Sequence, residues 1–107
     1  MLARIWRGST AASKADDYLK YMNKTVVQEY RATQGNRGVY LLRRIDGSKA
    51  EFLLLSLWES RDAIKTFAGP EIDKAKYYPE DKSFLVDLES TVTHYELLAG
   101  PEAAGAA

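Results

Sequence analysis

The sequence predicts an α+β fold: one antiparallel sheet with helices over one face and a second copy of the chain over the other. The main observation is Lys49–Trp58, which is apolar on both faces if it is a strand, because side chains alternate along a strand. One face carries Phe52, Leu54, Ser56 and Trp58, and the other carries Leu53, Leu55 and Leu57. Such strands are covered on both sides. Only two substantial helical stretches accompany this strand, so the uncovered face predicts a homodimer joined sheet to sheet.

The first expected strand is Leu2–Ser9. Alternation places Arg7 on one face, together with Ala3 and Ile5, and Arg4 and Trp6 on the other. We expect the face of Arg7 to point towards the helices. We assign Arg4 and Trp6 to the dimer interface.

A helix is expected next, ending by Gly35 at the latest. Three residues are possible N-caps: Ser9, Thr10 and Ser13. Asp16 and Asp17 suit the positive end of the helix dipole. Apolar side chains then recur at helical spacing and form one stripe: Ala15, Tyr18, Leu19, Met22, Val26 and Tyr30.

The middle of the chain predicts a hairpin and a short helix. Strands over 37–45 and 49–58 flank Asp46-Gly47, which supplies the positive φ angles of a tight turn. Alternation places Arg43 and Arg44 on opposite faces, so one of them is turned inward or lies at the interface. Ser60 is expected to cap a helix whose inner face is Ala63, Ile64 and Phe67.

The last third is expected to continue as helix from Gly69-Pro70 to Pro79, since proline suits the first helical position and ends a helix already under way. A loop over 79–89 contains a short apolar piece, Phe84-Leu85-Val86, and Thr91–Leu98 is the last strand. The resulting order is β-α-β-β-α-β, the ferredoxin-like arrangement.

Composition indicates one domain over residues 1–99 and a disordered tail over 100–107. Lys plus Arg is 15 and Asp plus Glu is 15, so no global charge favours nucleic acid or an anionic membrane. Cysteine is absent, which excludes disulfides and thiolate metal sites. No apolar run approaches the ~20 residues of a membrane helix. We therefore expect a cytoplasmic protein with no membrane partner.

Three segments carry a resemblance to a known family: LLSLWES at 54–60, AIKTFAG at 63–69 and VTHYE at 92–96. The pattern Trp-x-Ser-x-x-Ala runs from the first segment into the second, at a strand-to-helix junction. The chain resembles the antibiotic biosynthesis monooxygenase (ABM) family of the dimeric α+β barrel superfamily. This resemblance implies sheet-to-sheet dimers and a pocket between the sheet and the helices. The activities it implies are diverse, from cofactor-free oxygenation of aromatic compounds by an oxidoreductase to dismutation and isomerisation, and the fold alone does not choose among them.

The superfamily also has a haem-degrading branch, which the residues here do not match. That branch uses an Asn on the first strand, a Trp nine residues after the junction Trp, and a His ten residues further. In this chain those positions fall near Arg7, at Phe67 and at Tyr77. A tyrosine can ligate haem iron, but the set as a whole is missing, so haem degradation is not expected.

Two residues are candidate catalytic groups. His94 is the only histidine, and imidazole accepts protons near neutral pH; the alternative is a structural or exposed histidine. Tyr77 would offer a phenolic hydroxyl at the mouth of the pocket, and the alternative is a half-exposed helix end. One histidine without a carboxylate motif makes a poor metal site, so no metal is expected.

Four residues are candidates for substrate binding: Arg7, Trp58, Phe67 and Tyr78. Arg7 would hold a carboxylate, phenolate or enolate, or else it pairs with an acid at the sheet edge. Trp58 and Phe67 are core residues that would also line a flat apolar cavity. Tyr78 precedes Pro79 and would help to close the pocket.

Three classes of function remain open. The first is a cofactor-independent monooxygenase or a related enzyme acting on a small aromatic or enolisable substrate. The second is a non-catalytic protein that binds or senses a small aromatic or acidic ligand. The third is a structural dimer without a ligand. The aromatic residues, the candidate arginine and the family resemblance favour the first.

Overall fold

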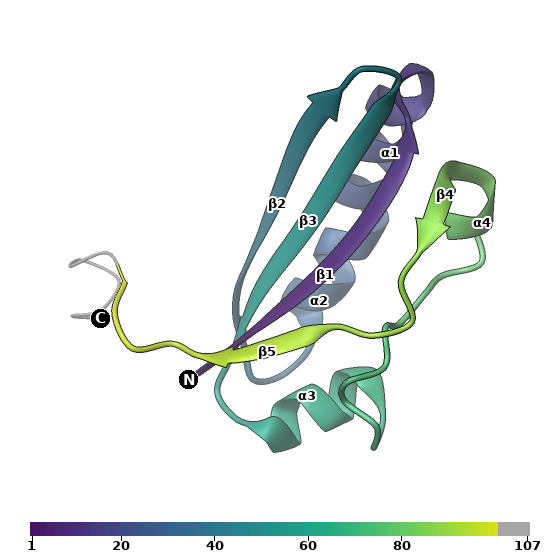
Figure 1. Ribbon diagram of the computed structural model, residues 1–107. Coiled ribbons are helices and arrows are strands. Elements are labelled where there is room, and N and C mark those ends of the chain that lie inside the picture. The colour runs from purple at the N-terminus through teal and green to yellow at the C-terminus, as the bar shows by residue number, and fades with distance from the viewer. Residues whose placement is uncertain (101–107) are drawn as a thin grey trace.

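The computed structural model describes residues 1–100 and has the predicted α+β architecture (Figure 1). Five strands form one sheet: β1 (Leu2–Ala11), β2 (Asn36–Asp46), β3 (Lys49–Trp58), β4 (Leu85–Leu88) and β5 (Thr93–Glu96). The order is β2-β3-β1, and both β4 and β5 pair with β1. Every pair is antiparallel. The ferredoxin-like order is therefore confirmed, with the last strand divided in two.

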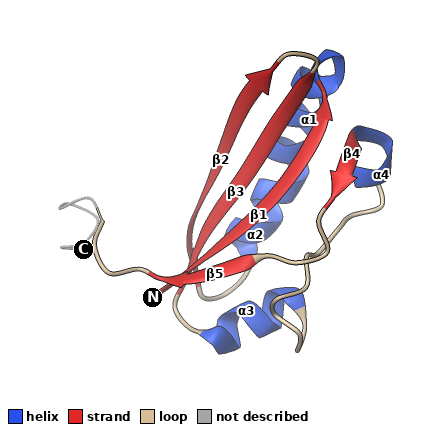
Figure 2. Cartoon of the chain, in the orientation of Figure 1, coloured by secondary structure: helices blue, strands red, loops and turns tan. Residues whose placement is uncertain are grey.

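A nearly continuous helical stretch covers one face of the sheet (Figure 2). It consists of a 3-10 turn (Ala12–Lys14), α1 (Ala15–Tyr21), a π-helical turn (Met22–Val26) and α2 (Val27–Ala32). The predicted stripe is buried at Ala15, Tyr18, Met22, Val26 and Tyr30. The wider π turn also accounts for the burial of two consecutive valines, Val26 and Val27, because it shifts the helix face that meets the sheet.

The central hairpin and the cap of the third helix form, with the turn one residue later than the predicted Asp46-Gly47. The loop between β2 and β3 is Gly47-Ser48, in which Gly47 has φ 63°. α3 (Arg61–Ala68) begins after Ser60, whose hydroxyl accepts a hydrogen bond from the N–H of Ala63 at 3.2 Å. Arg43 faces the helices, since it pairs with Asp16 of α1 at 2.9 Å.

The predicted helical continuation after Gly69-Pro70 is wrong. Gly69 has φ 92°, and residues 69–80 form turns and extended chain rather than a helix. This chain is held by backbone bonds to the segment before β5: Val92 N–H to the carbonyl of Asp73 at 2.8 Å and Ala75 N–H to that of Ser90 at 3.0 Å. α4 (Asp81–Phe84) is one turn, and β5 is shorter than the expected strand. Pairing between extended segments replaces helix here.

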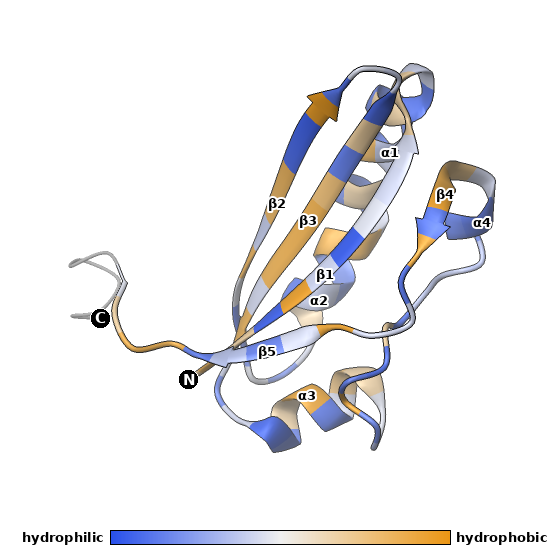
Figure 3. Cartoon of the chain, viewed as in Figure 1, coloured by the Kyte–Doolittle hydropathy of each residue, from blue (hydrophilic) through white to orange (hydrophobic). Residues whose placement is uncertain are grey.

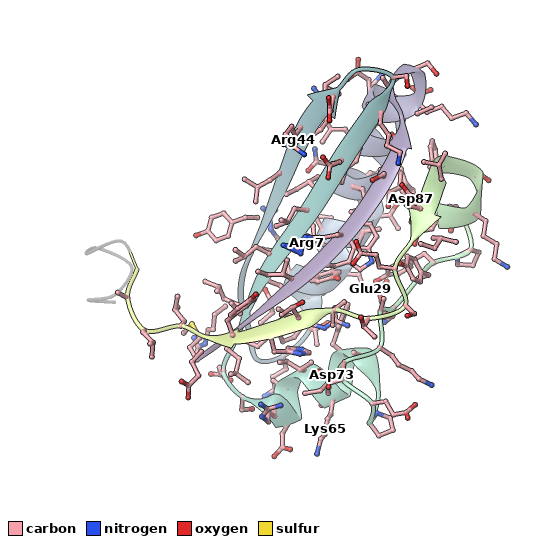
Figure 4. The ribbon with its side chains drawn as sticks, viewed as in Figure 1. Arg7, Glu29, Arg44, Lys65, Asp73 and Asp87 are labelled. Atoms are coloured by element: carbon pink, nitrogen blue, oxygen red, sulfur yellow. The ribbon has the colours of Figure 1, made fainter. Side chains whose placement is uncertain are left out.

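The assignment of β1 to its two faces is also reversed. Arg4 lies opposite Ser56 and Trp6 opposite Leu54, on the face that the helices cover. Arg4 is 1% exposed and Trp6 is 4% exposed. Arg7 lies opposite Leu53 on the other, open face (Figure 4). Alternation along a strand divides its side chains between two faces. Because β3 is apolar on both faces, the pattern does not show which face the helices cover.

The open face of the sheet is apolar and uncovered within one chain. Hydrophobic residues run along β3 and recur on its neighbour β2 (Figure 3). Tyr40 is 54% exposed, Leu42 51% and Tyr95 54%. No helix in residues 1–100 has the length and hydropathy to cross a bilayer. Most of the predicted tail, residues 101–107, lies outside the described residues.

Candidate functional site

The space between the sheet and the helical layer contains a small cavity of about 10 Å³. Residues from β1, β3, the helical stretch and the chain after α3 line it: Trp6, Tyr18, Met22, Val26, Tyr30, Leu54, Lys76, Tyr78 and Asp81. A cavity needs roughly 10–15 Å³ to hold one water molecule. In this form the protein is therefore closed around the place where the resemblance implies a pocket.

A larger groove of about 420 Å³ lies outside this cavity. It is lined by Tyr77, Tyr78, Pro79, Asp81, Lys82 and Leu88. Tyr78 and Asp81 line both spaces, so these two residues separate the groove from the inner cavity. Tyr77, Tyr78 and Pro79 all line this outer groove.

Asp81 holds this dividing segment on the helical layer. The side chain is 2% exposed and accepts hydrogen bonds from the Tyr18 hydroxyl at 3.0 Å and from the Tyr78 N–H at 2.7 Å. Burial raises the pKa of Asp81, and these two donors oppose the rise. The carboxylate therefore links α1 to the segment that closes the cavity.

Arg4 is a buried cation with incomplete hydrogen bonding. Its Nη2 donates to the carbonyl of Lys74 at 3.1 Å, and its guanidinium lies 5.7 Å from the centre of the Phe67 ring. Nε and Nη1 are buried and have no hydrogen-bond partner among the described residues. Burial lowers the pKa of Arg4, while Tyr30, Tyr78 and Asp73 raise it.

His94 lies beside Arg4, because the two residues are partners in the pairing of β5 with β1. Its Nδ1 is 3.0 Å from Oδ1 of Asp73, and its Nε2 is buried without a partner in the described part of the chain. Burial lowers the pKa of His94, the Asp73 hydrogen bond opposes this, and Arg4 lowers it further. The imidazole is therefore neutral near pH 7, with the Nδ1 proton directed at the carboxylate.

The tyrosines of this region are protonated donors. Burial raises the pKa of Tyr30 to about 12, although Arg4 lowers it. Burial also raises the pKa of Tyr78, and the nearby carboxylate of Glu29 raises it further; no hydrogen bond of normal geometry forms at its hydroxyl within residues 1–100. The Tyr77 hydroxyl instead donates to the carbonyl of Glu89, and the Tyr77 ring packs edge to face on Trp6.

The structure brings some of the predicted residues together and separates others. His94 and Tyr78 lie on the helix side of the sheet, near Arg4. Trp58 and Phe67 pack in the core, with ring centroids 5.2 Å apart. Arg7 is separated from all of them, exposed on the open face. There it lines a shallow hollow of about 410 Å³ together with Leu42, Arg44, Glu51, Leu53 and others.

The sequence prediction missed three residues of this region: Arg4, Tyr30 and Asp81. Arg4 shares a face with Trp6, but the choice of that face was reversed. Tyr30 was assigned only to the helix stripe, although it also contacts Phe67 at a centroid distance of 4.4 Å. Asp81 gives no signal in the sequence, because its importance depends on contact with Tyr18, 63 positions away.

No cluster of three potential metal ligands exists within residues 1–100. No protein-family model matches the chain, and no curated protein matches it. Solved structures do match, and they have the architecture described above. The fold is that of the antibiotic biosynthesis monooxygenases.

Three structures with this ABM fold illustrate the similarity. A candidate antibiotic biosynthesis monooxygenase of Nitrosomonas europaea has a TM-score of 0.67 and 16% identity, over 92% of this chain and 100% of that one. Rv0793 of Mycobacterium tuberculosis has a TM-score of 0.61 and 22% identity, over 92% of this chain and 96% of that one. The haem degrader MhuD of the same organism was solved with two haems in its active site. It has a TM-score of 0.57 and 20% identity, over 94% of this chain and 99% of that one. At these identities the similarity establishes the fold.

The residues of this chain do not fit a haem. While Tyr78 and Asp81 close it, the inner cavity of about 10 Å³ is far too small for a porphyrin, as it is for any ligand larger than a water molecule. The single histidine is bound to Asp73 through Nδ1, and its Nε2 lies buried beside a cationic arginine. Phe67 is a core residue, and the hydroxyl of Tyr77 is bound to a backbone carbonyl.

Proposed function

We propose that the chain is a cofactor-independent monooxygenase, or a related small-molecule enzyme, whose aromatic or enolisable substrate binds between the sheet and the helices. The observation that carries the proposal is the division of this region by Tyr78 and Asp81 into an outer groove and an aromatic-lined inner cavity. The ABM fold supports the same class of chemistry, because many of its solved members carry that description.

The substrate would enter by displacing the segment that contains Tyr78 and Asp81. Few regular elements hold residues 69–80, which form turns and a single bridge from Lys74 to Thr91. Segments of this kind open at low cost in free energy. Displacement would join the outer groove of about 420 Å³ to the inner cavity. The combined space falls within the roughly 300–1,000 Å³ of a ligand pocket.

The reaction would begin with removal of a proton from a carbon acid or phenol. The resulting anion gives an electron pair to O₂ and forms a hydroperoxide after taking back the proton. Loss of water then leaves a carbonyl, so that R₂CH₂ + O₂ gives R₂C=O + H₂O. The substrate supplies all the electrons, and one oxygen atom enters the product. Such chemistry needs a base, an anchor for the anion and a site that excludes water.

His94 is proposed as the base and Tyr78 as a hydrogen-bond donor to the substrate. Asp73 fixes the Nδ1 proton of His94, which leaves the Nε2 lone pair free to accept a proton. The lowered pKa of His94 keeps this lone pair available at neutral pH. Tyr77 is proposed to shape the groove, and Trp58 and Phe67, which are core residues in the closed form, are proposed to contact the substrate after the closing segment has moved.

A second copy of the chain is proposed to cover the open sheet face. Leaving this face wet is costly, at roughly 25 cal/mol per Å² of apolar surface. The dimer interface would therefore carry Leu53, Leu55 and Leu57 together with Arg7. It would not carry Arg4 and Trp6, which the helices already cover.

Oxygen uptake tests the enzyme. Purified protein, free of added metal and flavin, is mixed with anthrone in an oxygen electrode. The expected result is consumption of one O₂ for each anthraquinone formed, at a rate that His94→Gln lowers by at least tenfold. Uptake no faster than in buffer for anthrone and for 1,5-dihydroxynaphthalene would reject the oxygenase. Binding of either compound without turnover would favour the second candidate, a non-catalytic ligand-binding protein, for which the unpaired buried donors are equally suitable.

A further inference from the structure

We infer that Arg4 is an internal anion-binding residue and that its ligand is an aromatic anion: a phenolate, an enolate or an arene carboxylate. The inference rests on the proposed function, because it names the substrate class for the same site. It assigns the anchoring role to a residue of β1 on the face opposite Arg7.

The hydrogen bonds of Arg4 indicate a missing acceptor. A guanidinium has five N–H donors and no acceptor. The side chain is 1% exposed; Nη2 donates to the backbone carbonyl of Lys74, and the Tyr30 hydroxyl lies close enough to raise the pKa of Arg4. Nε and Nη1 are shielded from solvent and unpaired. Buried charges are normally paired, so Arg4 lacks the anion that its burial requires.

The other arginines show that carboxylates in this chain are used elsewhere. Arg37 pairs with Glu59, Arg43 with Asp16 and Arg44 with Glu51, all on the surface. No described carboxylate forms an ion pair with Arg4. Asp73 is the carboxylate that raises its pKa, after the larger effects of Tyr30 and Tyr78, yet the Asp73 side chain is 80% exposed and bound to His94. The buried arginine is therefore among those without a carboxylate partner in residues 1–100.

Among the groups that act on the pKa of Arg4, the exposed carboxylate of Asp73 is the one that carries an opposite charge. The lowered pKa of His94 makes that neighbour neutral near pH 7, and the raised pKa values of Tyr30 and Tyr78 keep both phenols protonated. Arg4 itself remains charged, since arginine is effectively always protonated in proteins. The result is a local positive field beneath the sheet, which favours an anion.

The side chains that pack around Arg4 favour an aromatic ligand. The Arg4 guanidinium faces the ring of Phe67 at 5.7 Å, and that ring contacts Tyr30 at 4.4 Å and Trp58 at 5.2 Å between centroids. Flat apolar walls around one cation suit a ring that carries a single negative group. Tyr30 and Tyr78 also line the inner cavity, so the anion would reach Arg4 from that side once the closing segment moves.

The test is the NMR signal of the Arg4 side-chain Nε–H in the intact wild-type protein, assigned through bonds. The protein is titrated with 2-naphthoate and, separately, with neutral 2-naphthamide at constant ionic strength. The expected result is a saturable shift of the Arg4 signal with naphthoate and none with naphthamide. The Nε–H of Arg7, on the open face, serves as the matched control and should show no saturable shift.

An Arg4 signal that does not move, or that moves equally with both compounds, would overturn the inference. So would a saturable naphthoate shift confined to Arg7. This readout is independent of turnover. A saturable Arg4 shift without oxygen uptake would reject the monooxygenase and support the anion site. Oxygen uptake with an unshifted Arg4 signal would support the monooxygenase and reject the anion site.

Discussion

The hydroxyl of Tyr18 on α1 donates a hydrogen bond to Oδ1 of Asp81 across 3.0 Å. Asp81 also accepts the N–H of Tyr78, so one carboxylate joins the helical layer to the segment that closes the inner cavity. Opening this segment requires the Tyr18–Asp81 bond to break. This hydrogen bond therefore holds the proposed entrance closed.

Tyr18→Phe should remove the hydrogen bond to Asp81 and make opening of the closing segment easier. The buried carboxylate loses one of its donors, so the free energy of unfolding should fall by about 1–3 kcal/mol. Hydrogen exchange of residues 77–84 should also become faster, measured by mass spectrometry. Tyr40→Phe, on the open face, is the control and should leave both quantities unchanged. Exchange in 77–84 as slow as in the wild type would show that Asp81 does not control this segment.

The pKa of His94 should lie below 6.5 in the folded protein. Its burial and the nearby Arg4 disfavour the charged imidazole more than Asp73 favours it. The unfolded chain therefore binds this proton more tightly than the folded chain. The resulting stability is fully present above about pH 6.5, the ordinary histidine value, and is lost as the pH falls through the folded pKa.

Proton NMR of the single histidine measures this pKa directly. His94→Gln should remove the corresponding pH dependence of the melting temperature. A folded-state pKa at or above the ordinary value would mean that Asp73 outweighs burial and Arg4. His94 would then be largely protonated and unsuited to act as the proposed base.

Arg4→Met should keep the stability of the wild type within about 1 kcal/mol or increase it, because the substitution removes an unpaired buried charge. It should also abolish binding of 2-naphthoate, measured by calorimetry. Arg7→Met is the matched control, since it removes the same charge from the other face of the same strand. A loss of several kcal/mol in Arg4→Met would identify Arg4 as a structural residue with a permanent partner.

Leu55→Glu should convert the proposed dimer to monomers. The side chain lies on the open face at the centre of β3, and a carboxylate in a dry interface costs several kcal/mol. Sedimentation at micromolar concentration gives the mass. Ile45→Glu, an exposed position at the end of β2, is the control and should remain dimeric. A wild-type protein that is monomeric with native circular dichroism would contradict the sheet-to-sheet interface.

Local signals predicted much of the fold. A tight turn at Gly47, the Ser60 cap and the helix stripe from Ala15 to Tyr30 each depend on neighbours close in sequence, and all three form, although the turn residues are Gly47-Ser48 and not Asp46-Gly47. The order of strands follows from these elements and from right-handed connection rules. Local chemistry was sufficient where contacts are local.

The errors arose where distant residues decide the outcome. Residues 69–80 have a helix-like start at Pro70, but pairing with the chain before β5 determines their conformation. The two faces of β1 were exchanged because β3 is apolar on both sides. Because of that exchange, the sequence prediction placed the anchor at Arg7, whereas we propose Arg4, which has the same residue type and lies on the same strand.

The most direct test of the account is a crystal structure of the protein with 2-naphthoate. We predict electron density for the ring system on the helix side of the sheet, next to Phe67 and Tyr30, with the carboxylate on Arg4. Tyr78 and Asp81 should be displaced from their closed positions. Density for the ligand only on the open face beside Arg7, or with residues 69–84 unchanged, would contradict the proposed site.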